Sequence, residues 1–158
     1  MLALVLRLHA PLMSFGNVAV DNRRPTAEFP PLSAVAGLIG GALGYQRSQT
    51  HLLQRLQDRL RLASRIDRSG ELITDFQTVD LNQPWMDGSK RGVGWTTQDE
   101  VHERRGQNIR GTHIRYRQYW ADRIATVAIG LEPENDPPPS LSGVAEALRS
   151  PCRPLYLG

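Results

Sequence analysis

Residues 29–44 read FPPLSAVAGLIGGALG and follow an RRPT motif at residues 23–26. After the two prolines, small and aliphatic residues continue for the length of a helix. Four glycines lie in or just beyond this helix: Gly37, Gly40, Gly41 and Gly44. Because glycine inside a helix costs about 1 kcal/mol relative to alanine, we expect these positions to permit the close approach of a strand, another backbone or a ligand.

The start of this helix has two possible roles. Pro30 and Pro31 rigidify the approach, and we expect Ser33 or its neighbour to cap the free amides of the first turn. An open helix start beside Arg23 and Arg24 also suits a phosphate, because free N–H groups and the helix dipole both favour an anion. Core packing and phosphate contact remain alternatives here.

The composition indicates one small domain spanning residues 1–158. The single cysteine, Cys152, forms no internal disulfide, and no apolar run has the length of a membrane span or a leader peptide. We therefore expect a cytoplasmic protein with no membrane partner.

Basic charge is concentrated in one segment. The formal net charge is only +3, and Lys90 is the one lysine among 19 basic residues. Residues 90–123 hold much of the basic excess, and arginine, which dominates it, grips phosphate and stacks on bases. Its members are Lys90, Arg91, Arg104, Arg105, Arg110, Arg115, Arg117 and Arg123.

The hydrophobic pattern predicts a regular series of elements. Residues 2–8 have the pattern of a central buried strand, and residues 9–31 that of a long irregular connection. Helices are expected at residues 33–43, 50–60 and 140–148, and strands at 61–67, 71–79, 112–119 and 121–131. We expect the strands at 61–67 and 71–79 to form a hairpin, residues 82–111 to form a protruding arm, and 153–157 to be extended.

This order is typical of an α+β, ferredoxin-like domain of the RRM or RAMP type, with a thumb-like β-hairpin arm inserted at residues 82–111 before the last main strand. The four histidines lie in separate elements without paired cysteines, so we expect no metal site and no cofactor.

The stretch THIRYRQYW at residues 112–120 carries the clearest binding pattern. If it is extended, His113, Arg115 and Arg117 share one face and Tyr116 lies on the other. Alternate arginines can follow a phosphate backbone, and neighbouring aromatic rings offer base-stacking platforms. A solvated strand face with the aromatic residues in the core is the alternative.

The arm combines basic and aromatic residues. Trp85 and Trp95 lie among Lys90, Arg91, Arg104 and Arg105 in a glycine-rich segment without apolar periodicity. Tryptophans exposed there would need a partner, which is either a base or a neighbouring protein.

Five motifs in order resemble one family. RLHAPLMSFG at residues 7–16, RRPTAEFPPLSAVAGLIGGALG at 23–44, DFQTV at 75–79, RQYWAD at 117–122 and PLYLG at 154–158 resemble the CasD-type subunits of the type I-E CRISPR surveillance complex, Cascade, within the RAMP superfamily. Phe15 stands where a tryptophan is common in that family, and relatives continue beyond the Tyr-Leu-Gly with a basic glycine loop.

The resemblance implies a non-catalytic subunit that binds the 5′ handle of the CRISPR RNA and caps the backbone filament. Its partners would be the backbone RAMP subunits, the large subunit and, indirectly, target double-stranded DNA. The thumb would kink the guide RNA where the handle meets the spacer. Arg117 and Tyr116 match the family's aromatic-Arg-x-Tyr pattern, and Arg24 and Thr26 match its Arg-Pro-Thr. The expected RNA-contacting residues are Arg23, Arg24, Thr26, Ser33, Lys90, Arg91, Arg104, Arg105, Arg110, His113, Arg115, Tyr116 and Arg117.

Two other functions stay open at this point. A related CRISPR subtype uses such a subunit as a metal-independent endoribonuclease on precursor RNA, and His113, Tyr116 and Lys90 offer an acid, a base and a positive charge. A purely protein-binding adaptor is the third alternative.

Overall fold

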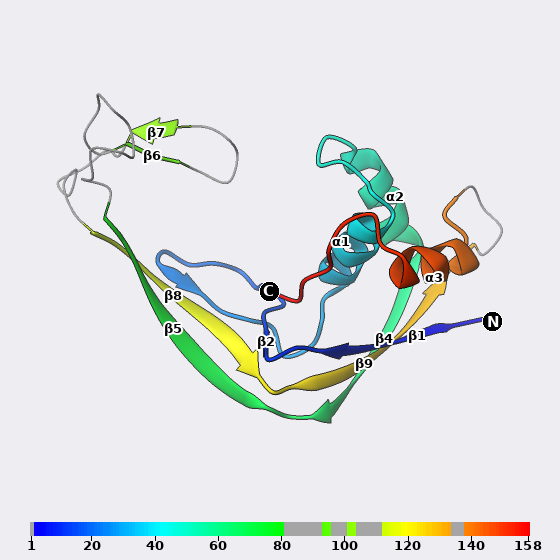
Figure 1. The fold of residues 1–158 in the computed structure, drawn as a ribbon, viewed down its shortest axis with the longest axis horizontal. Coiled ribbons are helices and arrows are strands. Elements are labelled where there is room, and N and C mark those ends of the chain that lie inside the picture. The colour runs from blue at the N-terminus through cyan, green and yellow to red at the C-terminus, as the bar shows by residue number, and fades with distance from the viewer. Residues whose placement is uncertain (1, 81–92, 96–100, 104–111, 134–137) are drawn as a thin grey trace.

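Three helices cover one face of a three-stranded sheet, and a long two-stranded ribbon continues from that sheet (Figure 1). The computed structural model describes residues 2–80, 93–95, 101–103, 112–133 and 138–158. This is a mixed α and β architecture, as the hydrophobic pattern predicts. No helix in these ranges is long and apolar enough to cross a membrane.

The helix-covered sheet has β9 (Ile124–Leu131) at its centre, between β1 (Leu4–His9) and β4 (Leu60–Arg68), with both pairs antiparallel. Val127 and Ile129 of β9 are fully buried. The prediction that residues 2–8 form a central strand is therefore wrong, because among the described strands β1 pairs with β9 alone. Its apolar run was misleading, since Val5 lies on the uncovered face and is 64% exposed.

The predicted helices are confirmed to within one residue at each end. They are α1 (Leu32–Ala42), α2 (Thr50–Arg59) and α3 (Leu141–Arg149). The N-cap of α1 is Pro31, without a side-chain hydrogen bond, and Ser33 is an exposed residue inside the first turn. The expected serine cap is thus wrong for α1, whereas in α3 the Ser140 hydroxyl accepts a hydrogen bond from the Gly143 N–H.

The glycines of α1 do not all serve close approach. A Cβ on Gly40 would collide with Cδ2 of Leu53 in α2, and Gly44 has a φ of +79° with its Cβ position 3.2 Å from Cys152. Close approach is confirmed at these two positions. The prediction of close approach is wrong for Gly37, where an added Cβ would meet nothing within 4 Å. At Gly41 an added Cβ would make only an ordinary contact, at 3.9 Å from Leu155.

The ribbon consists of β5 (Glu71–Asp80) and β8 (Thr112–Ala121), paired antiparallel along their full length. The predicted hairpin between residues 61–67 and 71–79 is wrong, because β4 pairs with β9 and β5 pairs with β8. Gly70, with a φ of +64°, packs so tightly against the Ala121 carbonyl oxygen that a Cβ would collide there. The glycine therefore turns a corner between two sheets instead of reversing the chain.

The connection at residues 9–31 contains two short strands, which the sequence pattern did not predict. These are β2 (Leu12–Met13) and β3 (Arg23–Arg24), and both pair with β8. Residues 153–157 form no strand, although the Ser14 N–H donates to the Leu157 carbonyl oxygen at 2.6 Å. Within the arm, β6 (Val93–Trp95) and β7 (Val101–Glu103) pair antiparallel, and the rest of residues 82–111 lies outside the described residues.

Candidate nucleic-acid interface

The short strand β3 brings the RRPT motif against the middle of β8. Arg23 pairs in parallel with Tyr116, and Arg24 with Arg117. The Tyr116 N–H donates to the Asn22 carbonyl oxygen at 2.9 Å, just before β3 begins. Four predicted RNA-contacting residues therefore lie on neighbouring strands, although the sequence separates the motifs by about ninety positions.

Side-chain hydrogen bonds hold this loop against the ribbon. The buried Thr26 hydroxyl accepts from the Phe15 N–H at 2.9 Å, and the Thr26 N–H donates to Oε1 of Gln118 at 3.4 Å. The indole N–H of Trp120 donates to the Ala27 carbonyl oxygen at 2.9 Å. Thr26 is thus engaged with the protein backbone, and its place in the loop positions the arginines before it.

A pocket of about 510 Å³ opens between this loop and the ribbon. Its size falls in the range of sites for small organic ligands. Arg23 places its guanidinium carbon 5.8 Å from the centre of the Tyr116 ring. Phe76, which is 56% exposed, lies across the strand pair with its ring centre 5.5 Å from that of Tyr116. The lining residues are Val18, Val20, Arg23, Arg24, Pro25, Thr74, Tyr116 and Gln118.

The opposite face of the ribbon carries arginines. Strand alternation places Arg115 and Arg117 on the side away from Tyr116, opposite Gln77 and Asp75 of β5. The Asp75 carboxylate accepts a hydrogen bond from the Gln77 amide at 2.7 Å. Neither arginine forms an ion pair with any residue that the structure describes, and Arg117 is exposed whereas Arg115 is partly buried.

Arg123 has a structural role that the sequence did not reveal. Its Nε donates to the Ser69 carbonyl oxygen at 2.7 Å and its Nη1 to the Glu28 carbonyl oxygen at 2.6 Å, while its guanidinium carbon lies 3.2 Å from the centre of the Trp120 ring. Burial lowers the pKa of Arg123, and Glu28 partly opposes that shift. The sequence pattern had grouped Arg123 with the basic excess because no local signal separates a buried arginine from an exposed one.

Of the remaining predicted residues, the structure describes the side chain of only one. Ser33 is exposed on the first turn of α1 and does not line the pocket. The structure describes only the backbone of His113, which pairs with Val79. Lys90, Arg91, Arg104, Arg105 and Arg110 lie outside the described residues. Within the described ranges no group of three metal-ligating side chains is found.

Comparison with known proteins gives the family. Residues 3–158 match the family model of the CRISPR-associated protein (Cas_Cas5). The chain is 32% identical over 155 residues to the CRISPR system Cascade subunit CasD of Escherichia coli (strain K12), covering 98% of this chain and 64% of that protein.

Solved structures are also similar to this chain. One, a chain of a CRISPR RNA-guided surveillance complex, superimposes with a TM-score of 0.70 at 28% identity, covering 99% of this chain and 57% of the other. The second, described as the crystal structure of a Cas protein, has a TM-score of 0.55 at 24% identity and supports the fold alone.

The fold is mixed α and β, and its pocket brings two arginines, Arg23 and Arg24, beside the Tyr116 ring. The chain is a member of the CRISPR-associated Cas5 family, because the family model spans nearly all of it. It spans less than two thirds of the length of the curated relative it matches.

Proposed function

We propose that this chain is a non-catalytic RNA-binding subunit of a CRISPR RNA-guided surveillance complex, and that it holds the 5′ handle of the guide RNA. The observation that carries the proposal is the pairing of β3 with β8, which joins Arg23 and Arg24 to Tyr116 and Arg117. The similarity to a Cascade subunit and to a chain of such a complex supports it.

In this proposal the pocket receives one base. The Tyr116 ring offers a stacking surface, Phe76 extends it, and Gln118 and Thr74 offer hydrogen-bonding groups. Stacking on an aromatic residue contributes about 1–3 kcal/mol per base. Arg23 and Arg24 then bind the flanking phosphates, because arginine forms paired hydrogen bonds with phosphate oxygens.

The arginine face of the ribbon would bind the next part of the same RNA strand. Arg115 and Arg117 lie across β8 from the pocket, so an RNA strand that crosses the ribbon contacts both faces. Thr26 holds the loop against the protein through its hydroxyl group, and its predicted contact with RNA stays a prediction. The proposed contacts of Ser33, His113 and the arm residues Lys90, Arg91, Arg104, Arg105 and Arg110 extend this path.

We further propose that the fold is ferredoxin-like, with residues 82–111 as its thumb. The strand order β1-β9-β4 with helices on one face, and the antiparallel pair β6 and β7 within the arm, support this interpretation. The proposed protein partners are the backbone and large subunits of the complex, and target DNA is contacted only indirectly. The proposed location is the cytoplasm, and RNA binding is proposed to need no cofactor.

The first experiment measures binding of the chain to handle RNA and to a scrambled RNA of the same composition. Replacement of Tyr116 by alanine should weaken handle binding about 10- to 100-fold, as the loss of one stacked base predicts, and Tyr116→Phe should retain it. Tyr156→Ala is the matched control, because this exposed tyrosine lies on the C-terminal tail. Equal affinity for handle and scrambled RNA would instead favour a protein-binding adaptor.

The salt dependence of binding tests the arginines. Each phosphate contact on a single strand contributes about 0.7 to the slope of log affinity against log salt. Arg117→Ala should lower that slope by about this amount, whereas Arg65→Ala, on the uncovered face of β4, should leave it unchanged. Replacement of Lys90, Arg91, Arg104 and Arg105 without any change in slope would mean that the arm contacts protein.

Incubation with precursor RNA in the absence of divalent metal tests the non-catalytic part of the proposal. We expect the RNA to remain intact. Cleavage that disappears in His113→Ala would contradict the proposal and identify an endoribonuclease.

A further inference from the structure

The pocket beside the RRPT motif sets a polar pair of side chains next to an aromatic pair. Thr74 of β5 and Gln118 of β8 are cross-strand partners, so their side chains are neighbours on one face of the ribbon, and both line the pocket. The next pair along this face is Phe76 with Tyr116. A base that stacks on the Tyr116 ring therefore has Thr74 and Gln118 within reach of its edge.

The side-chain amide of Gln118 is held in one orientation. Its Oε1 atom accepts a hydrogen bond from the Thr26 N–H at 3.4 Å. Because a backbone N–H can only donate, the oxygen of the amide must face the loop and its NH2 group must face away from it. The NH2 group has no hydrogen-bond partner among the residues that the structure describes. Gln118 therefore offers donors, and not its oxygen, to a ligand in the pocket.

The other side chains around the pocket add to this excess of donors. Arg23 and Arg24 line it, and a guanidinium group has donors only. None of the described lining residues carries a carboxylate. Nearby acceptors are already used within the fold, since the Val20 carbonyl oxygen accepts from the Arg23 N–H at 3.1 Å. The Asn22 carbonyl oxygen likewise accepts from the Tyr116 N–H at 2.9 Å.

The four bases differ in what they present to such donors. Guanine and uracil carry a carbonyl oxygen beside a ring N–H, whereas adenine and cytosine carry an amino group in place of that oxygen. The Gln118 NH2 group can donate to the carbonyl oxygen, and the Thr74 hydroxyl can accept from the ring N–H. An amino group would instead meet the Gln118 NH2 group donor to donor, which leaves both without a partner.

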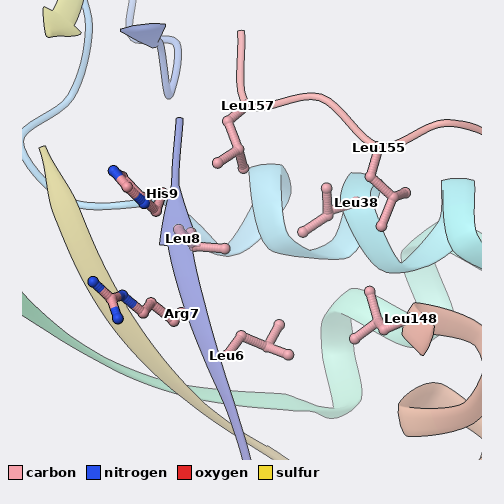
Figure 2. Close-up of a pocket in the computed structure, with 8 residues that line it drawn as sticks. All are labelled: Leu6, Arg7, Leu8, His9, Leu38, Leu148, Leu155 and Leu157. Atoms are coloured by element: carbon pink, nitrogen blue, oxygen red, sulfur yellow. The ribbon is translucent and has the colours of Figure 1, made fainter. Parts of the chain in front are cut away.

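Another hollow, of about 260 Å³ beside β1, shows by contrast what the polar pair contributes (Figure 2). Leucines of β1, α1, α3 and the C-terminal tail point into it, while the side chains of Arg7 and His9 point away. A base in that hollow would bury its hydrogen-bonding edge without partners, which costs free energy. Of these two sites, only the pocket at Tyr116 combines an aromatic surface with groups that can read the edge of a base.

We propose that this pocket selects a keto base, guanine or uracil, and that the fixed amide of Gln118 is the group that discriminates. The inference rests on the proposed function, because it takes the 5′ handle of the guide RNA as the ligand, and it adds the class of base that is bound. Stacking on Tyr116 and phosphate binding by the arginines cannot supply this selection, because every base has a π face and every nucleotide has a phosphate.

Replacement of each base of the handle RNA in turn tests the selection on the unmodified chain. At one handle position, exchange of G or U for A or C should weaken binding about 10-fold, as expected for the loss of one contact to a base edge. Exchange between G and U at that position should cost less. Preferential binding of handle over scrambled RNA without any such position would overturn the selection and leave the proposed function standing. Equal binding of handle and scrambled RNA would overturn both.

Gln118→Glu then tests the discriminating group, because it changes the edge of the pocket while nearly keeping its shape. One carboxylate oxygen can still accept from the Thr26 N–H, and the other presents an acceptor where the NH2 group was. At the same handle position this variant should bind A or C more tightly than G or U, by about 10-fold.

Gln77→Glu is the matched control, because it adds the same charge on the opposite face of the ribbon. Whatever its effect on overall affinity, it should keep the preference for G or U. A Gln118→Glu variant that keeps this preference, or a Gln77→Glu variant that reverses it, would overturn the role of Gln118, and neither result bears on whether the chain binds handle RNA.

Discussion

The helix-covered sheet and the ribbon are both built from antiparallel strands, but the sheet buries its apolar side chains and the ribbon exposes several of its own. In the sheet, β9 buries Val127 and Ile129 completely beneath the helices. In the ribbon, Phe76 and Ile114 remain exposed although both have high strand propensity. The sheet therefore contributes most of the stability of the fold, while the ribbon carries apolar and cationic groups that the fold itself does not use. Such groups are where a partner is expected.

The largest difference between the two regions is expected when one apolar residue is truncated in each. Ile129→Ala should lower the free energy of unfolding by about 2–5 kcal/mol, because it empties a fully buried site at the centre of the sheet. Phe76→Ala should cost less than about 1 kcal/mol, since that ring is largely exposed. Urea denaturation of both variants gives the two values, and similar losses would mean that the ribbon is part of the core.

The junction between the two regions depends on Arg123. Arg123→Ala should lower the free energy of unfolding by about 2–3 kcal/mol, because it removes two charge-assisted hydrogen bonds and leaves the carbonyl groups of Ser69 and Glu28 unpaired. Arg123→Lys is the control that keeps the charge but not the paired donors. A lysine variant as stable as the original chain would mean that charge alone holds the corner.

Two glycines of α1, Gly37 and Gly40, differ in what an added side chain would meet. Gly37→Ala should raise the free energy of unfolding by about 0.5–1 kcal/mol, since a Cβ there meets nothing within 4 Å and alanine is the better helix former. Gly40→Ala should gain less or lose stability, because its Cβ collides with Leu53. Thermal unfolding of both variants measures the difference, and an equal gain at both sites would contradict a packing role for Gly40.

The smallest expected effect concerns Asp67 of β4. Hydrogen bonds from the Thr126 hydroxyl and from Arg65 lower the pKa of its carboxyl group. Because the folded pKa is depressed, the carboxylate favours folding above its ordinary unfolded pKa, and this contribution is lost as the pH falls through the folded value. Thr126→Val should raise the pKa of Asp67, as a carboxyl NMR titration would measure. An unchanged titration would show that Arg65 alone sets it.

Most elements could be predicted from local pattern, and the errors have one physical origin. Apolar periodicity located all three helices and the strands at β4, β5, β8 and β9 to within about three residues. It did not reveal which strands pair. The Ser-Gly at residues 69–70 favours a hairpin locally, yet Arg123 and the Ala121 carbonyl oxygen close on Gly70 and make it a corner.

For the candidate site, the sequence identified the residue types but not their assembly. The Arg-Pro-Thr motif and the aromatic-arginine pattern were visible as separate motifs. Their meeting depends on the pairing of a two-residue strand with β8, which is too short for any periodicity to signal. Arg123 was misjudged for the related reason that burial is a property of the packed chain and not of its neighbours in sequence.

The sequence by itself determined the helices, the strand lengths, the family resemblance and the pool of cationic and aromatic residues, because these depend on interactions between residues a few positions apart. Only the tertiary structure decided that β1 pairs with β9 and with no other described strand, that the chain turns a corner at Gly70, and that Arg23 lies beside Tyr116. Those outcomes depend on contacts between distant segments, whose free energies are set by burial and hydrogen bonding after the chain has folded.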